Sequence, residues 1–179
     1  MLSDYGCAKE IKYAHYVSKA PELGIQMDYP AGWICLERQD AKAGYVNVLF
    51  SEPGKGSHLK ATMMVTAKKI STLKPERTTL ESFARGFTSA RLKSKDAKVL
   101  SQSPIRIIGL PAFETRMSYQ APDEIYAVKT DFLPVKERVI VFQRKDTFYI
   151  VRYRNKEEEF NNLDGVFTHC IKTIKFRDA

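Results

Sequence analysis

The chain has 179 residues, and its 44% hydrophobic content is enough to build the core of one domain of ordinary size. No apolar run approaches the roughly 18 residues of a transmembrane helix, and the first residues lack the apolar stretch of a signal peptide. The three cysteines, Cys7, Cys35 and Cys170, cannot all pair and do not cluster, so neither a disulfide framework nor a zinc site is predicted from them.

The net charge of +8 is concentrated in one quarter of the chain. Residues 55–98 hold 11 Lys and Arg against 3 Asp and Glu, and the rest of the chain is close to balance. This asymmetry favours an acidic partner, although a basic face that only aids solubility is an equally good interpretation. Nucleic acid is disfavoured, because the aromatic residues of this quarter, Phe83 and Phe87, fall on a helix stripe expected to be buried.

The first half of the chain predicts four extended segments. In residues 23–29, alternation places Ile25, Met27 and Tyr29 on one face of a strand. Pro30 and Gly32 turn the chain at a corner, and Trp33 begins the next extended stretch. Two more strands, 45–51 and 59–67, are expected to form a hairpin around a loop rich in Gly and Pro.

A helix is predicted to follow. Thr78 and Glu81 have the spacing of a capping box just before an apolar stripe. The stripe falls at helical spacing and consists of Leu80, Phe83, Ala84 and Phe87.

The second half again predicts strands. Residues 98–120 read as two strands about a turn at 109–111, and further strands are expected at 125–133, 138–144 and 147–153. The last of these is apolar on both sides, which is typical of a central strand covered on both faces. Its side chains divide into Phe148 and Ile150 against Tyr149, Val151 and Tyr153.

A second helix is predicted to close the chain, with Asn155 and Glu158 at its start. Its apolar stripe is Phe160, Leu163, Phe167, Cys170, Ile171 and Ile174. The predicted fold class is therefore α+β, with a largely antiparallel β-sheet of seven to eight strands and α-helices packed on its faces. We expect residues 1–21 to form an N-terminal arm or tether and residues 22–179 a single domain.

The motifs that usually carry chemistry are weak in this sequence. His15, His58 and His169 have no metal-ligand spacing. His169 and Cys170 are adjacent, but neighbouring side chains on a helix point about 100° apart, so they do not form a nucleophile and base. The glycine-rich loop 52–58 lacks the spacing of a phosphate-binding loop and precedes a strand. We predict no catalytic residue, no metal and no cofactor.

Four motifs in order resemble the PsbP-like superfamily, which includes the Mog family of Ran-binding proteins and bacterial DcrB-type lipoproteins. They are "YPAGW" (29–33), "TTLESFARGF" (78–87), "IIGLPAFETRMSY" (107–119) and the closing segment "FYIVRYRNKEEEFNNLDGVFTHCIKTIKF" (148–176). The resemblance spans roughly residues 22–177. It implies a sandwich of helices around the sheet, a structural anchoring role for Trp33, and non-enzymatic binding without a catalytic residue set.

The leading hypothesis is accordingly a binding or assembly module whose basic face docks an acidic protein or an anionic membrane surface. The residues expected to form that face are Lys68, Lys69, Lys74, Arg77, Arg85 and Arg91. Cys7, preceded by Gly6, raises the hypothesis of a lipidated bacterial envelope protein, although Asp4 and the missing apolar stretch argue against it. Without an upstream signal the expected compartment is the cytoplasm. The alternative hypothesis is a small-ligand or metal-binding protein with a pocket between sheet and helix.

Overall fold

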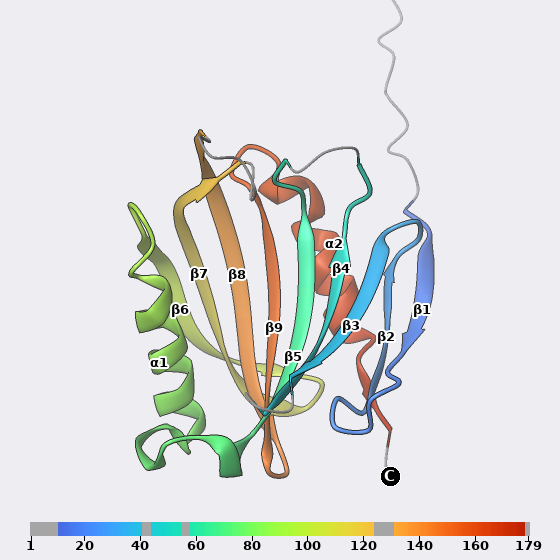
Figure 1. Ribbon diagram of the computed structural model, residues 1–179, viewed down its shortest axis with the longest axis vertical. Coiled ribbons are helices and arrows are strands. Elements are labelled where there is room, and N and C mark those ends of the chain that lie inside the picture. Colours follow the sequence, from blue (N-terminus) through green and yellow to red (C-terminus); the bar gives the residue numbers. More distant parts are fainter. Residues whose placement is uncertain (1–10, 41–43, 55–57, 124–130, 178–179) are drawn as a thin grey trace, which may run out of the picture.

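The computed structural model describes residues 11–40, 44–54, 58–123 and 131–177 (Figure 1). Within them the chain forms a seven-stranded sheet, a three-stranded sheet, two α-helices and two short 3-10 turns. The predicted α+β class, with an antiparallel sheet and helices on its faces, is confirmed. None of the helices in these ranges is long and apolar enough to cross a membrane.

The large sheet is antiparallel throughout. Its strands lie in the order β3 (Ile34–Asp40), β4 (Tyr45–Ser51), β5 (Thr62–Lys69), β9 (Thr147–Lys156), β8 (Phe132–Arg144), β7 (Leu110–Pro122) and β6 (Lys98–Ile107). The small sheet has the order β1 (Tyr13–Val17), β2 (Ile25–Pro30) and β10 (Lys175–Phe176).

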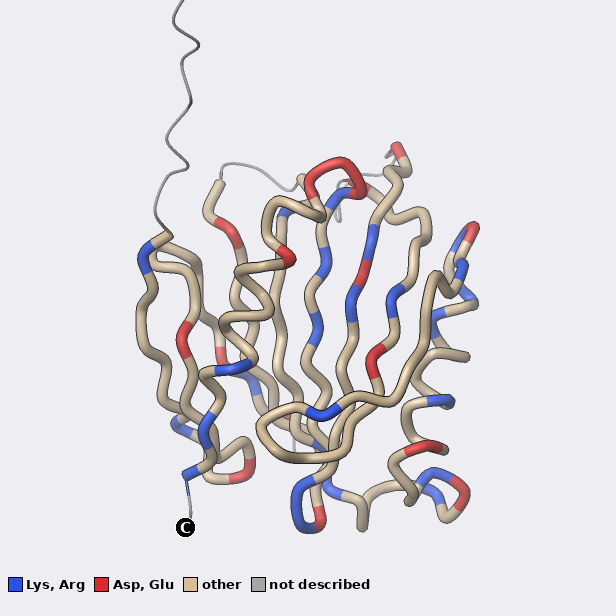
Figure 2. Tube along the Cα trace, turned by 180° about the vertical axis from the view of Figure 1, so that it is seen from behind, with Lys and Arg blue, Asp and Glu red and all other residues tan. Residues whose placement is uncertain are grey.

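The helices lie on opposite faces of the large sheet. One face carries α1 (Leu80–Arg91), which follows the 3-10 turns η1 (Ile70–Thr72) and η2 (Pro75–Arg77) and contacts β7 and β8 (Figure 1). The other face carries α2 (Phe160–Lys172), which contacts β2 and β9 and is seen in front of the strands in Figure 2. The central strand β9 is therefore covered on both sides, as its apolar residues on both faces predicted.

The main core lies between the large sheet, α2 and the small sheet. The predicted stripe of α2 is confirmed: Phe160, Phe167, Cys170, Ile171 and Ile174 are buried, and Leu163 is partly buried. The Tyr153 ring on β9 packs against the rings of Phe160 and Phe167, and the Tyr153 hydroxyl donates a hydrogen bond of 2.9 Å to the carbonyl oxygen of Phe160.

A second core lies under α1. Phe83 stacks on Phe148 of β9 with 4.4 Å between ring centroids. The predicted stripe of α1 is correct, but its predicted cap is wrong by one residue. The hydroxyl of Thr79, rather than that of Thr78, accepts a hydrogen bond from the Ser82 amide. The Thr78 hydroxyl instead donates to the carbonyl oxygen of Pro75 in η2.

The predicted start of α2 is also wrong. Asn155 is a buried residue of β9 and lies five positions before the first residue of α2. Its amide group donates to the Tyr153 hydroxyl and to the Glu159 carbonyl, both at 3.3 Å. The Asn155 side chain thus joins the end of β9 to the turn before α2. The sequence pattern alone could not separate this role from that of a helix cap.

Two strand boundaries differ from those predicted. Phe132 and Leu133 belong to the same strand as residues 138–144, so one strand replaces the two expected there, and the segment 125–130 lies outside the described residues. The turn expected at 109–111 lies at Ile108 and Gly109, which both have positive φ. Such a two-residue turn matches the twist of a tight hairpin.

Part of the N-terminal segment belongs to the folded domain. Residues 13–17, which were expected in an arm, pair with β2 as strand β1, and Tyr16 is buried in the main core. Tyr16 is the one buried residue of β1, so this strand has no alternating buried face for the sequence to display. Cys7 lies outside the described residues.

The corner at Trp33 is a tight turn. Gly32 has a φ of +85°, and the Trp33 amide donates to the Pro30 carbonyl oxygen at 3.2 Å. Trp33 is partly buried and packs against the main core. This placement fits the anchoring role expected for it.

Candidate functional site

The helix α1 covers only half of its face of the large sheet. Strand register places one row of side chains across that face, in the order Leu36, Leu49, Met64, Arg152, Val139, Thr115 and Gln102. The β6–β8 end of the row lies under α1, where Gln102 hydrogen-bonds Thr88. At the β3 end no described helix lies over the strands, and Leu36 is 43% exposed. We call the uncovered part of this face, over β3, β4, β5 and the adjoining side of β9, the open face.

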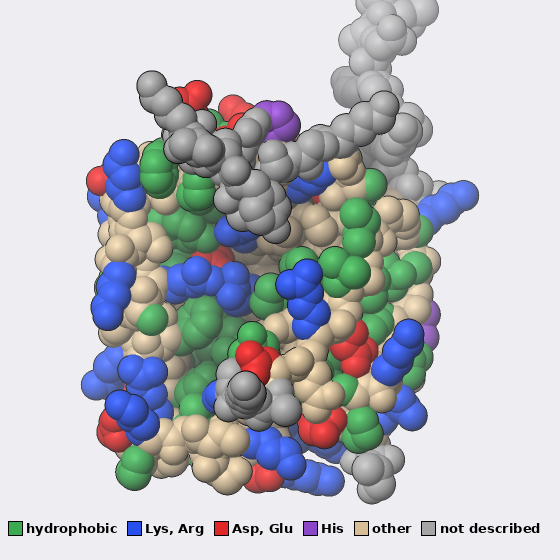
Figure 3. Space-filling model, in the orientation of Figure 1, with side chains coloured by type: hydrophobic (Ala, Val, Ile, Leu, Met, Phe, Trp, Pro, Cys, Tyr) green, Lys and Arg blue, Asp and Glu red, His purple; other side chains and the backbone are tan. Residues whose placement is uncertain are grey.

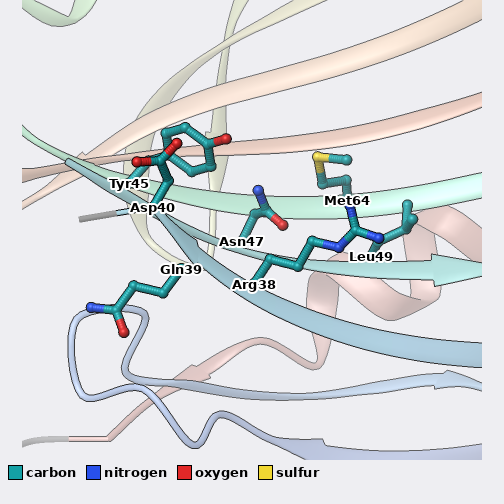
Figure 4. A pocket seen from close by; sticks show the side chains of 7 residues that line it. All are labelled: Arg38, Gln39, Asp40, Tyr45, Asn47, Leu49 and Met64. Carbon is teal, nitrogen blue, oxygen red and sulfur yellow. The ribbon is translucent and has the colours of Figure 1, made fainter. Parts of the chain in front are cut away.

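The open face holds a hollow of about 440 Å³ near its β3 edge (Figure 4). Figure 4 shows Arg38 extended along the strands toward Leu49, with Asn47 and Met64 beside it. The complete lining is Arg38, Gln39, Asp40, Tyr45, Asn47, Leu49 and Met64. The lining is thus amphipathic and comes from three adjacent strands. A hollow between α1 and the sheet, where the alternative hypothesis placed a pocket, is smaller at about 180 Å³.

A buried charge cluster lies where the open face meets α1. Glu137 on β8 is fully buried, and both Arg91 of α1 and Arg152 of β9 approach its Oε1 atom, at 3.4 and 2.8 Å. The contact to Arg152 Nε is an ion pair without the alignment of a hydrogen bond. Arg154 lies across from Glu137 in the strand register and adds a third guanidinium. Burial, followed by repulsion from the neighbouring arginines, lowers the pKa of Arg152 even though Glu137 opposes the shift.

Several polar atoms of this cluster lack a hydrogen-bond partner. Among the described residues these buried atoms are Glu137 Oε2, Arg152 Nε, Arg154 Nε and the hydroxyl of Tyr119. Burial and the charge of Glu137 raise the pKa of Tyr119, so its hydroxyl stays protonated and able to donate. Unsatisfied buried donors are uncommon in folded proteins and mark this cluster as unusual.

Sequence reasoning missed Glu137, Arg152 and Arg154. The available signal was alternation: Glu137 lies between Val135 and Val139, and Arg152 follows Ile150 by two residues, so both charged residues continue a buried face of their strand. A charge at such a position requires a partner or a function.

The six basic residues predicted as one face differ in exposure and in their partners. Lys69, Lys74 and Arg77 are exposed at the end of β5 and along η2. Arg85 is exposed on α1 and pairs with Glu81 at 2.7 Å. The other two are partly buried: Lys68 lies 5.9 Å from the ring centre of Tyr45, and Arg91 turns inward to Glu137.

The histidines lie in pairs with aspartates. His15 and His169 flank Asp28, with nitrogen–oxygen distances of 2.9 and 3.9 Å, and His58 contacts Asp123 at 2.9 Å. Among the described residues, no group of three or more His, Cys, Asp and Glu has an arrangement that could hold a metal ion. Cys170 is buried and His169 exposed, so the predicted separation of the two side chains is confirmed.

Comparison with known proteins identifies the fold. No protein-family model and no curated protein sequence matches the chain. Among solved structures, the cyanobacterial PsbP protein CyanoP of Synechocystis matches with a TM-score of 0.60 and 13% identity, over 98% of each chain. LpqN of Mycobacterium tuberculosis, involved in cell envelope biogenesis, matches with a TM-score of 0.55 and 12% identity, over 95% of this chain and 93% of its own.

The Ran-binding protein Mog1p of Saccharomyces cerevisiae also matches, with a TM-score of 0.53 and 11% identity, over 94% of this chain and 97% of its own. The chain is therefore an α+β protein with the PsbP-like fold, as its motifs predicted. At such low identities these matches establish the fold alone.

Proposed function

We propose that the protein is a non-enzymatic binding or assembly module that docks an acidic partner through basic side chains. Two proteins of the same fold are described as Ran-binding and as involved in cell envelope biogenesis, which supports a binding role. The observation that carries the proposal is the exposed basic segment from the end of β5 to η2. There Lys69, Lys74 and Arg77 point to solvent within nine residues of chain, with Glu76 as the only intervening acid.

Binding to defined acidic probes tests this proposal. The probes are polyglutamate, for an acidic protein, and phosphatidylglycerol vesicles, for an anionic membrane, each at low and at high salt. We expect the wild-type protein to bind one of them at low salt. Reversal of three charges, Lys69→Glu, Lys74→Glu and Arg77→Glu, should abolish that binding.

A matched control reverses Lys12, which precedes β1, Lys172 of α2 and Lys175 of β10, all of which are exposed. This variant has the same net charge as the first. If both variants lost binding equally, net charge rather than the basic segment would be responsible. If neither lost binding, the proposal would be wrong.

We further propose Cys7 as a lipidation site that would hold the module at a bacterial membrane. The envelope role stated for LpqN supports this idea. Expression from the native gene with labelled palmitate, compared with Cys7→Ser, measures it directly. If the wild-type protein took up no label, lipidation at Cys7 would be contradicted, and the proposed docking function would be unaffected.

The amphipathic hollow on the open face favours a second candidate function, binding of a small molecule. Its volume falls within the range of small-ligand sites, roughly 300–1,000 Å³. Fragment screening by NMR should then shift the signals of Leu49 and Met64, and Asn47→Trp should fill the hollow and remove those shifts. Elemental analysis of protein purified without chelator tests the metal-binding form of this alternative.

A further inference from the structure

The junction between α1 and the open face is a groove with a charged upper part and an apolar floor. Figure 3 shows the sheet hollowed beside α1, with Lys and Arg side chains across the hollow and hydrophobic side chains beneath them. Arg91 and Arg152 lie over the Phe87 ring, at 5.6 and 5.9 Å from its centre. Two guanidinium groups are thus held at the α1 side of the groove. On the open side, strand register places Met64 directly beside Arg152.

The charges of this groove are unbalanced. Within the part of the chain that the structure describes, Arg91, Arg152 and Arg154 face one carboxylate, Glu137, which leaves two positive charges in a largely buried setting. Excess buried charge of one sign is costly unless it is paired. An anionic group in the groove would supply the missing pairing.

The opposite face of the sheet shows what a balanced network looks like in this protein. There Arg116 and Arg138 pair with Glu114 and Asp164, at distances between 2.7 and 3.2 Å. Thr168 of α2 accepts a further bond from Arg138. Two cations meet two anions under α2, so this network is complete without a ligand. In the groove beside α1, by contrast, the described cations outnumber the described carboxylates.

The unpaired atoms define what would complete it. Arg154 and Tyr119 are neighbours, but Arg154 Nε and the Tyr119 hydroxyl are buried and have no well-aligned hydrogen bond to any described residue. A carboxylate offers several lone pairs and accepts from guanidinium groups in a bidentate manner. The exposed apolar side chains on the open face, including Ile34 at 48% and Leu36 at 43%, offer contacts for apolar groups next to that carboxylate.

We infer that this groove is the docking site for a short acidic segment of a partner protein, in which carboxylate side chains alternate with apolar ones. The inference rests on the proposed function and specifies its surface and partner. The carboxylates pair with Arg91 and Arg154, and the apolar side chains pack on Met64 and Leu36. A peptide reaches these arginines beside α1, whereas a flat membrane surface meets the exposed basic segment first.

The test uses a fluorescein-labelled synthetic peptide in which glutamates alternate with leucines and phenylalanines. A second peptide, with lysine in place of glutamate, and phosphatidylglycerol vesicles are compared with it. The groove variant is Arg91→Gln with Arg154→Gln, which leaves the Glu137–Arg152 pair in place. The matched control, Arg85→Gln with Arg106→Gln, removes the same charge from exposed positions. Circular dichroism confirms that each variant is folded.

We expect the glutamate peptide to bind the wild-type protein saturably, and the groove variant to bind it about tenfold more weakly. The control variant should change affinity by about twofold or less. A third variant, Glu137→Gln, removes the competing carboxylate and should tighten binding, an effect that a purely structural role for the cluster would not produce.

Four results would overturn the inference. One is unchanged affinity in the groove variant, and another is equal binding of the lysine peptide. The third is binding that only the reversal of Lys69, Lys74 and Arg77 abolishes, which would leave the proposed function standing and move its surface to the exposed basic segment. Binding of vesicles without binding of the peptide likewise rejects the groove as the docking site.

Discussion

Glu37 on β3 accepts a hydrogen bond from the Tyr16 hydroxyl on β1, and this contact joins the edge of the large sheet to the small sheet. The same carboxylate accepts the backbone amides of Lys19 and Ala20, at 3.0 and 2.7 Å. The Tyr16 ring packs edge-on against Phe50 with 5.4 Å between centroids. One carboxylate therefore satisfies three donors and fixes the small sheet against the large one.

This arrangement predicts a pH-dependent contribution to stability. Burial alone would raise the pKa of Glu37, but the hydrogen bonds from Tyr16 and the two amides outweigh it and hold the pKa below its ordinary value of 4.5. The ionised carboxylate thus stabilises the fold above the unfolded-state pKa, and this stabilisation is lost as pH falls through the lower folded-state pKa. We expect Glu37→Gln to lower the free energy of unfolding at neutral pH by about 1–3 kcal/mol.

Urea denaturation followed by Trp33 fluorescence measures this difference at several pH values. The gap between wild type and Glu37→Gln should narrow as pH falls below about 4.5. Glu76→Gln, at an exposed position of η2, is the control and should change the free energy of unfolding by about 0.5 kcal/mol or less. A gap that stays constant with pH would show that the charge of Glu37 is not responsible.

The stacked pair Phe83 and Phe148 predicts how strongly α1 is held to the sheet. Phe148 is a fully buried residue of the second core, so its truncation leaves a cavity there. We expect Phe148→Ala to lower the free energy of unfolding by about 3–5 kcal/mol. Phe132→Ala removes the same atoms from a ring that is 48% exposed and contacts Lys95, and should cost about 1 kcal/mol or less. Equal losses in a denaturation experiment would contradict this account of the core.

Local periodicity predicted much of this fold because the buried faces of its elements are continuous in sequence. The alternation in β9 predicted a strand covered on both faces, and the stripe from Phe160 to Ile174 predicted α2. These patterns depend on neighbours two, three or four residues away, which the sequence displays directly. The order of motifs then connected the elements into a PsbP-like arrangement.

The candidate site could not be predicted in the same way, because strand register brings it together. Arg91 and Glu137 are 46 residues apart, and they meet only because α1 packs against β8. The charge count of residues 55–98 included Arg91 among the outward-facing cations, although its guanidinium turns inward. Composition records how many charges a segment has, and register decides which of them reach solvent.

The cap of α1 gives a direct test of a boundary that sequence alone placed wrongly. The Thr79 hydroxyl accepts from the Ser82 amide at 3.2 Å, and the Ser82 hydroxyl accepts from the Thr79 amide at 3.3 Å, so together they form the capping box. We expect Thr79→Ala to lower the free energy of unfolding by about 1 kcal/mol. Thr78→Ala, which removes only an exposed bond to Pro75, should cost less than half of that. The reverse ranking in urea denaturation would restore the predicted cap at Thr78.

Cysteine reactivity offers a last prediction, about the packing of α2. Burial raises the pKa of the Cys170 thiol to about 12, and the charge of Asp28 adds to the shift. At pH 8 only about one thiol in ten thousand is then ionised, and the thiolate is the reactive form. We expect iodoacetamide to leave Cys170 unmodified in the native protein and to alkylate it fully in urea. Cys35 is only partly buried, so it should react faster than Cys170 in the native protein. Peptide mass spectrometry separates the two sites, and equal native rates would mean that α2 opens from the sheet readily.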